Sequence, residues 1–184
     1  MATDDFAGTG ALQAAWEQED SGTASRVSGV CVGTGDAAYS WQDQNFGPNS
    51  VASLTIDGLT NSIQLFHTFN FNTGNGYGLE VNNGGQILIV RIDGGDAAPL
   101  ETINGVTQNA GDVFSLTRLG NNFRAARNGV NLGSGGTDST YNVAGRSGWA
   151  LGAAGDTITS WAAENAGGLN SRIAMNYYLQ QARQ

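Results

Sequence analysis

Two glutamates near the start of the chain, Glu17 and Glu19, have the best spacing for acid–base chemistry. Hydrolysis of a glycosidic bond needs two carboxyl groups on either side of that bond, about 5 to 10 Å apart. Side chains two residues apart on a strand point to the same face, which would bring the two carboxylates together. The pair lies beside a turn at Ser21 and Gly22, however, and this favours a solvated strand edge over an active site.

The single histidine, His67, lies in an apolar segment with Phe66 and Phe69. A catalytic triad of the hydrolase type would need a Gly-x-Ser-x-Gly nucleophile turn, and a zinc site would need partner ligands at defined spacings. The sequence contains neither, so we expect a packed or surface strand histidine. Gly8-Thr9-Gly10 and Gly33-Thr34-Gly35 do not complete a phosphate-binding Gly-x-Gly-x-x-Gly motif, which argues against a nucleotide site.

Six aromatic and polar residues are the candidates for sugar binding, because exposed aromatic rings stack on sugar faces and polar side chains bind hydroxyl groups. Among them, Trp41 and Tyr77 flank polar loops and are the best candidates for exposed rings. The other three tryptophans, Trp16, Trp149 and Trp161, sit in strand patterns that predict core positions. The candidate residues are Tyr39, Trp41, Asn72, Asn75, Tyr77 and Arg146.

The charge composition restricts the partners of the chain. Its 184 residues carry a formal net charge of −8, and the eight basic residues are all arginine. An acidic surface repels phosphate groups, so we expect neither nucleic acid nor an anionic membrane as a partner. The only cysteine, Cys31, lies between two valines, which predicts a buried strand position and excludes an intrachain disulfide.

The N-terminal residues contain neither the basic nor the apolar segment of a signal peptide. No apolar run approaches the roughly 20 residues of a membrane-spanning helix. We therefore expect a protein that is made in a cytoplasm and not exported by a cleaved signal.

The hydrophobic pattern predicts an all-β fold. Apolar residues alternate with polar ones through most of the chain, and the helical period is nearly absent. Pairs such as Asn83-Gly84 and Asn128-Gly129 are typical of hairpin turns. About twelve to fourteen short strands, with turns roughly every 8 to 12 residues, predict a two-sheet antiparallel sandwich. The expected strands include residues 62–69, 78–81, 86–92, 112–119, 123–127, 130–132, 148–152 and 157–162.

The C-terminal end differs from the rest of the chain. We expect residues 1–168 to form the sandwich and residues 169–184 to form a tail that docks on a neighbouring molecule. The tail pattern fits a short helix or a last strand. Its candidate docking residues are Arg172, Ile173, Tyr177, Tyr178 and Leu179.

Four segments together resemble one known family. They are Asp4-Asp5-Phe6 with the following Trp16, the hairpin from Gly111 to Ser134, the stretch Ala144 to Trp149, and Thr157 to Trp161. These segments look like the opening strand, the central hairpin, the late Gly-rich strand and the closing strand of concanavalin A-like lectin/glucanase (laminin-G-like) jelly rolls. The resemblance covers about residues 4–163 and implies a jelly roll whose closing strand pairs near the N-terminus.

The resemblance also implies candidate chemistry. Many members hold a structural Ca²⁺ between the first and last strands, which makes Asp4 or Asp5 the expected ligand. The closing strand carries Trp161 and Ala162 where such a site expects an aspartate, and this counts against calcium. The glucanases of the family use a Glu-x-Asp-x-x-Glu pattern, and the segment around Glu17 lacks it. Further carboxylates near turns are Asp93, Asp96, Asp138 and Asp156.

Similar free-standing jelly rolls occur in bacteriophage virions as capsid decorations, fibres and baseplate modules. By this resemblance we predict a non-enzymatic virion structural protein that acts by self-assembly and surface attachment, with other virion proteins and further copies of itself, including a trimer, as partners. The alternative is a lectin-like module that binds a host-surface glycan. A glycoside hydrolase is the weakest reading, for want of paired carboxylates, and no cofactor other than Ca²⁺ is expected.

Overall fold

A computed structural model describes residues 1–165, which form sixteen β-strands. Within these residues there is no apolar helix of the length needed to cross a membrane. The docking residues expected in the tail, Arg172, Ile173, Tyr177, Tyr178 and Leu179, lie outside the described residues, so their role stays a prediction.

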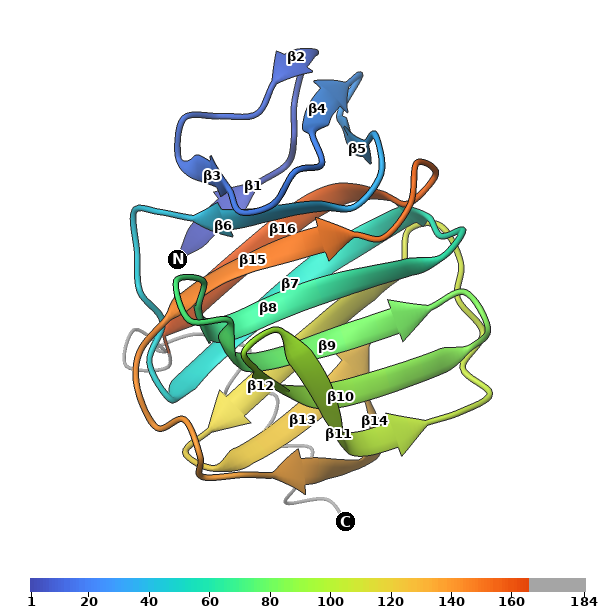
Figure 1. Cartoon of the computed structure of the whole chain (residues 1–184). Coiled ribbons are helices and arrows are strands. Elements are labelled where there is room, and N and C mark those ends of the chain that lie inside the picture. The colour runs from blue at the N-terminus through green and yellow to red at the C-terminus, as the bar shows by residue number, and fades with distance from the viewer. Residues whose placement is uncertain (166–184) are drawn as a thin grey trace.

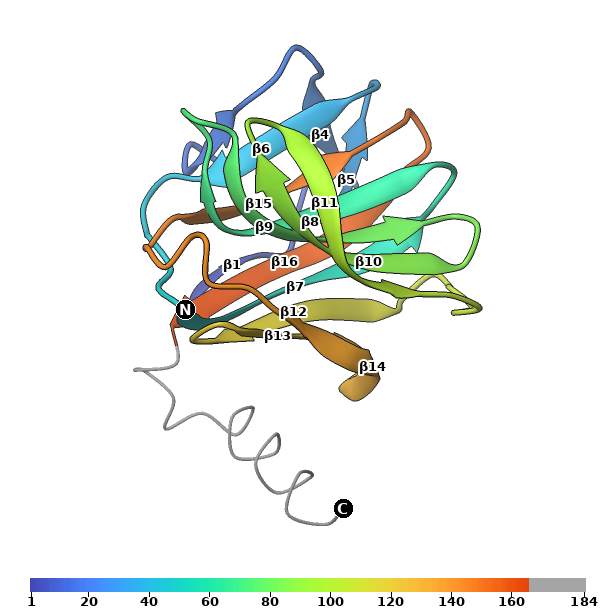
Figure 2. The same ribbon diagram turned by 60° about the horizontal axis from the view of Figure 1, so that its bottom comes forward.

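The strands form two antiparallel sheets that pack against one another, which confirms the predicted sandwich (Figures 1 and 2). In order, the nine-stranded sheet contains β14 (Val130–Thr137), β13 (Asn122–Arg127), β12 (Val113–Leu119), β7 (Asn49–Gly58), β16 (Thr157–Asn165), β5 (Val30–Gly33), β4 (Ala24–Val27) and β2 (Gly10–Ala11), with β1 (Ala2–Asp4) paired to β16. The seven-stranded sheet contains β11 (Asp96–Ile103), β10 (Gln86–Asp93), β9 (Asn75–Asn82), β8 (Ser62–Asn70), β15 (Arg146–Leu151), β6 (Ala37–Trp41) and β3 (Trp16–Gln18).

Two-residue alternation decides which side chains enter the core. In the β12–β13 hairpin, Leu116 lies opposite Ala125, and both are fully buried, as are Phe114 and Phe123. The turn after β13 places Asn128 at a φ of 51°, a left-handed conformation that asparagine tolerates and that suits a two-residue hairpin turn. The strands predicted from the alternation are confirmed.

The first strand and the last described strand pair with one another in the nine-stranded sheet. Ala2 pairs with Ala163 and Asp4 with Trp161, so the predicted pairing of the closing strand with the N-terminus is confirmed. The alternation pattern did not reveal β11, because Pro99 interrupts it. Proline is tolerated there because β11 is the outermost strand of its sheet, where a missing N–H leaves no ladder partner unsatisfied.

Aromatic side chains fill the core at the N-terminal end of the sandwich. Trp161 lies 4.8 Å from Trp16 and 5.3 Å from Trp41 between ring centroids, and Tyr39 stacks on Trp149. The predicted core positions of Trp16, Trp149 and Trp161 are therefore confirmed. The predicted burial of the single cysteine is confirmed as well.

A smaller apolar cluster lies on the other face of the seven-stranded sheet, the face turned away from the core. Phe66 and Phe69 of β8 pack there with Val90 and Ile92 of β10, and Phe71 covers them. Figure 2 shows the β8–β9 and β10–β11 hairpins projecting on this side, away from the nine-stranded sheet. The cluster therefore supports the two hairpins, which matters for the polar site described below.

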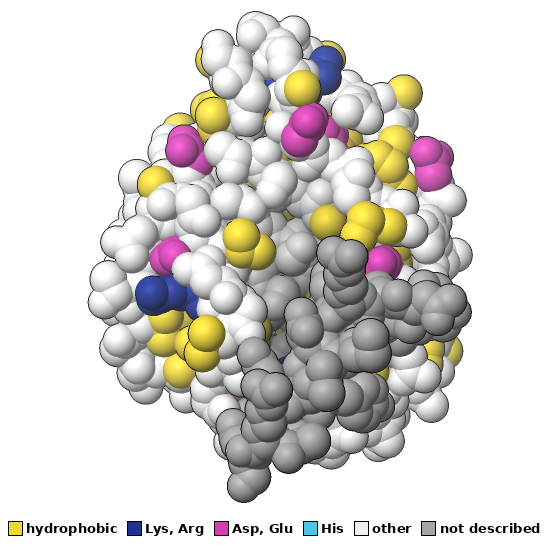
Figure 3. All heavy atoms as spheres, turned by 180° about the vertical axis from the view of Figure 1, so that it is seen from behind, with side chains coloured by type: hydrophobic (Ala, Val, Ile, Leu, Met, Phe, Trp, Pro, Cys, Tyr) yellow, Lys and Arg dark blue, Asp and Glu magenta, His cyan; other side chains and the backbone are white. Residues whose placement is uncertain are grey.

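The opposite side of the molecule carries few ionised groups. Figure 3 shows its visible surface as mostly uncharged, with isolated acidic and basic side chains. On this face, alternate residues of β7 and β16 are small and polar, and Thr55 and Ser160 contact one another through their hydroxyl oxygens at 2.7 Å. The larger groups of converging charged side chains, around Arg91 and Arg146, lie at the seven-stranded sheet, whereas Arg127 and Asp112 form a single pair at the nine-stranded sheet.

Candidate functional site

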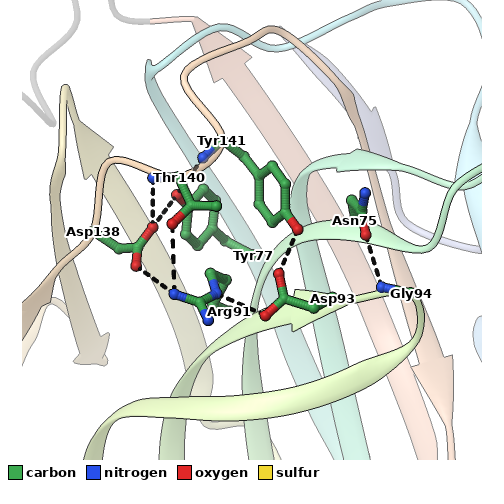
Figure 4. Close-up of polar contacts among 8 residues, drawn as sticks. All are labelled: Asn75, Tyr77, Arg91, Asp93, Gly94, Asp138, Thr140 and Tyr141. Carbon is green, nitrogen blue, oxygen red and sulfur yellow. Dashed lines mark hydrogen bonds and ion pairs between the residues drawn. The ribbon is translucent and has the colours of Figure 1, made fainter.

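A group of polar side chains gathers at one end of the sandwich, where β9 and β10 meet the loop that leads from β14 to β15 (Figure 4). We call this group the rim cluster. It joins side chains from two strands and one loop that are far apart in the sequence. Its members are Asn75, Arg91, Asp93, Asp138, Thr140 and Tyr141.

The rim cluster rests on two fully buried residues, Arg118 and Tyr77. Alternation along β12 turns Arg118 inward, and its guanidinium lies 4.8 Å from the centre of the Tyr77 ring. The guanidinium donates hydrogen bonds to Thr68 Oγ1 at 2.7 Å and to the carbonyl oxygen of Tyr141 at 2.5 Å. A buried cation thus ties the loop of the rim cluster to both sheets.

Asp138 is the inner carboxylate of the rim cluster. It accepts hydrogen bonds from the Tyr77 hydroxyl at 2.7 Å, the Thr140 amide at 2.8 Å and Arg91 Nη1 at 3.0 Å. Burial acts to raise the pKa of Asp138, but these donors stabilise the ionised form and lower it to about 2. Burial raises the pKa of Tyr77 to about 12, and the hydrogen bond to Asp138 contributes to that rise.

Asp93 is the outer carboxylate. It accepts hydrogen bonds from the Tyr141 hydroxyl and from Arg91 Nε, the latter at 2.8 Å, and these lower the pKa of Asp93. Next to it, Asn75 Oδ1 accepts a hydrogen bond from the Gly94 amide at 2.7 Å, which joins the β8–β9 hairpin to the β10–β11 hairpin. The polar groups of the rim cluster are therefore held in place before any ligand arrives.

The exposed side of the rim cluster still has hydrogen-bonding capacity. The exposed fraction of the side chain rises from 11% at Asp138 to 31% at Arg91 and 40% at Asp93. Among the described residues, Arg91 Nη2 and Asn75 Nδ2 have no hydrogen-bond partner, and neither is a buried unpaired atom. Each carboxylate oxygen can accept more than one hydrogen bond, so donors and acceptors both face solvent here.

The backbone beside these groups is open. Gly94 and Gly95 form the turn of the β10–β11 hairpin at positive φ, and a side-chain Cβ at either position would meet nothing within 4 Å. The Tyr141 ring is half-buried and borders the same polar groups. A partly exposed ring with fixed carboxylate, guanidinium and amide groups is a combination suited to a hydroxyl-rich ligand.

A second polar group lies on the outer face of the seven-stranded sheet, around Arg146. Arg146 Nη1 contacts Glu17, Glu19 Oε1 at 3.4 Å and Ser40 Oγ at 3.2 Å. Both glutamates thus pair with one arginine. The structure therefore places the pair in a partly exposed ion-pair network at the edge of the sheet, next to strand β3.

Comparisons with known proteins find several solved structures with a similar fold. The carbohydrate-binding module CBM66 from Bacillus subtilis has a TM-score of 0.66 at 13% identity, covering 80% of this chain and 96% of that one. A lichenase from a mouse hindgut metagenome also has a TM-score of 0.66, at 9% identity, with coverage of 89% and 98%. The calcium- and mannose-bound exoplasmic domain of VIP36 has a TM-score of 0.65 at 8% identity, with coverage of 82% and 83%.

The chain has the concanavalin A-like jelly-roll fold. No family model and no curated protein matches its sequence. At these identities the likeness shows the fold alone, so the site has to be argued from the residues of this jelly roll.

The jelly roll places the sequence-predicted sugar-binding residues in three different environments. Tyr39 and Tyr77 are only 7% and 0% exposed, so the prediction of exposed rings at these positions is wrong. Trp41 is partly buried and packs against the core. In each of the three, the alternation of the strand turns the side chain toward the inner face of its sheet, although polar loops lie nearby in the sequence.

The polar candidates lie closer to solvent but do not form one site. Asn75 belongs to the rim cluster, Arg146 lies in the ion-pair network on the outer face, and Asn72 is exposed in the β8–β9 turn. Sequence reasoning did not assign Arg91 or Tyr141 to a binding site. Besides Asn75, the sequence pointed to this region only through the turn carboxylates Asp93 and Asp138, which it indicated as possible oxygen ligands for calcium.

The carboxylates expected to bind calcium are used by the protein itself. Asp4 accepts hydrogen bonds from Trp16 Nε1 and the Phe6 amide, both at 2.7 Å, and from Gln13 at 3.1 Å. Asp5 caps the amide of Ala7 at 3.0 Å. Residues 1–165 contain no cluster of three or more His, Cys, Asp or Glu side chains that fits a metal ion. The residues near the first strand therefore do not fit calcium.

Proposed function

We propose that this jelly roll is a carbohydrate-binding module and that the rim cluster is its binding site. The observation that carries the proposal is the convergence of fixed Asp93, Arg91 and Asn75 groups beside the Tyr141 ring, with unused donors and acceptors facing solvent. The fold likeness to a carbohydrate-binding module and to the mannose-bound exoplasmic domain of VIP36 supports this proposal. The lichenase likeness supports hydrolysis less well, because Glu17 and Glu19 are both paired with Arg146.

The charge of the site indicates the class of sugar. At the site, Arg91 and the buried Arg118 balance the two carboxylates of Asp93 and Asp138, whereas the whole chain has a formal net charge of −8. Carboxylates accept hydrogen bonds from sugar hydroxyls, but they repel sulfated, sialylated or uronic acid sugars. The proposed ligand is therefore a neutral glycan.

The role as a virion structural protein stays a prediction, as do its virion partners, the trimer and the virion location. The three similar structures above are a carbohydrate-binding module, a domain of VIP36 and a lichenase, and they do not bear on this role. Glycan binding is compatible with attachment of a particle to a host surface, so both interpretations agree on a surface-recognition role.

A glycan array with matched variants tests the proposal. We expect the protein to bind neutral oligosaccharides and to ignore acidic ones, and Asp93→Asn to weaken binding about tenfold or more by removing a charged acceptor. Asp96→Asn is the control, because Asp96 is exposed on the same hairpin and outside the rim cluster. Calorimetric titration with the best array ligand measures the affinities.

One outcome would reject glycan binding itself, and another would reject the rim cluster as its site. An array without any hit for the folded protein would exclude glycan binding. A hit that Asp93→Asn leaves unchanged, while Arg146→Gln abolishes it, would move the site to the outer face of the seven-stranded sheet.

A further inference from the structure

The likeness to the calcium- and mannose-bound domain of VIP36 raises the question of whether sugar binding here needs a metal ion. Carboxylates on separate segments repel one another unless a cation neutralises them, and Ca²⁺ commonly does this with oxygen ligands at about 2.3 to 2.6 Å. In the described part of this chain, the residues near the first strand do not fit calcium, and no cluster of three acidic or imidazole groups exists. The rim cluster nevertheless contains two carboxylates that must be held together.

Three side-chain oxygens in the rim cluster converge on one group, the guanidinium of Arg91 (Figure 4). Arg91 Nε lies 2.8 Å from Asp93 Oδ2, and Arg91 Nη1 lies 3.0 Å from Asp138 Oδ2. Thr140 Oγ1 is 3.5 Å from the same Nη1 atom. Two carboxylates and a hydroxyl are the kinds of ligand that a hard divalent cation takes, and here the arginine occupies the space between them.

The elements that Arg91 connects are the ones that carry the proposed site. Asp93 ends β10 and leads into the glycine turn of the β10–β11 hairpin, whereas Asp138 and Thr140 belong to the loop that carries Tyr141. Guanidinium stays charged over the whole physiological pH range, and its planar fork can serve two carboxylates at once. One side chain thus supplies both the neutralising charge and the fixed geometry.

We infer that Arg91 acts as a built-in cation, which holds the β10–β11 hairpin and the Asp138–Tyr141 loop in the binding conformation and makes sugar binding independent of calcium. The sugar-binding part of this inference rests on the proposed function, but the positioning role of Arg91 does not depend on a ligand. In this inference Arg91 acts through Asp93 and the Asp138–Tyr141 loop, which it positions, in addition to the donor that its Nη2 atom offers to a sugar.

The first test compares the wild-type protein in EDTA with the same protein in about 10 mM CaCl₂, a concentration that saturates weak calcium sites. NaCl at equal ionic strength serves as the reference. We expect the melting temperature and the affinity for the array ligand to be unchanged. Loss of either in EDTA would overturn the inference.

The second test removes the cation. In Arg91→Ala the two carboxylates face one another without a counter-charge, so we expect amide exchange of residues 138–141 to become about tenfold faster. Calcium at about 10 mM should slow this exchange again, because the vacated position then accepts a divalent cation. A merely packing role for Arg91 would not produce a calcium effect.

Arg127→Ala is the matched control for the second test. Arg127 also pairs with an aspartate, at 3.6 Å from Asp112, and its side chain is 29% exposed against 31% for Arg91. We expect no calcium effect and no change in residues 138–141. Unchanged exchange in Arg91→Ala, or exchange that calcium does not slow, would overturn the inference. Neither variant of this second test needs a sugar, so failure of the proposed function would be seen separately on the array.

Discussion

Lowering the pH from about 6.5 to 4 should reduce the free energy of unfolding by about 3 kcal/mol through one residue, His67. Burial lowers the pKa of His67 from 6.5 to about 4, the hydrogen bond with Ser50 opposes this shift, and the charge of Arg118 adds to it. Each pKa unit corresponds to about 1.4 kcal/mol. Because His67 is fully buried, solvent does not screen this effect.

The direction of the change follows from the proton uptake of the two states. Between pH 6.5 and 4, the unfolded chain binds a proton at His67 and the folded chain does not, so acid favours unfolding. His67 is the only histidine, so no other imidazole titrates in this window. The lowered pKa of Asp138 acts in a separate, more acidic window, since its stabilising effect is lost as the pH falls from 3.8 toward 2.

Urea unfolding at pH 7, 5.5 and 4.5 measures this effect. His67→Gln is the matched variant, because an amide can still hydrogen-bond to Ser50 Oγ, which lies 3.0 Å from His67 Nε2. We expect the variant to lose most of the pH dependence between pH 6.5 and 4.5. Equal slopes for the variant and the wild type would show that His67 is not the group responsible.

Replacing Arg118 by leucine should cost about 3 kcal/mol or more of folding stability. The change leaves Thr68 Oγ1 and two partly buried carbonyl oxygens without their donor, and it removes the cation above the Tyr77 ring. Loss of the hydrogen bond to Tyr141 also frees the loop of the rim cluster. We therefore expect a lower urea midpoint together with weaker glycan binding.

The control for this prediction is Arg124→Leu on the neighbouring strand β13. Arg124 makes an exposed hydrogen bond to the Ser134 carbonyl oxygen, so its loss should cost less than about 1 kcal/mol. Arg118→Lys keeps the charge without the planar fork and should lie between the two. A cost for Arg118→Leu no larger than for Arg124→Leu would contradict the assigned role.

Sequence reasoning succeeded where a property depends on neighbouring residues. Alternation in segments such as 112–119 predicted strands, and the Asn128-Gly129 pair predicted a hairpin turn, because both follow from local backbone geometry. It failed for Tyr39 and for Tyr77, although Tyr77 follows the polar segment that contains Asn75. Their burial depends on which face of the strand meets the other sheet, and a period of two does not say which face that is.

Composition and alternation are properties of the chain alone, and they predicted an acidic, all-β protein with buried tryptophans at Trp16, Trp149 and Trp161. The meeting points of the charged groups depend on the folded arrangement of the strands and loops. Arg91 and Asp138 are 47 positions apart, and they meet because a loop crosses from one sheet to the other at the end of β10. Such a contact depends on strand register and loop path, which no short-range pattern in the sequence encodes.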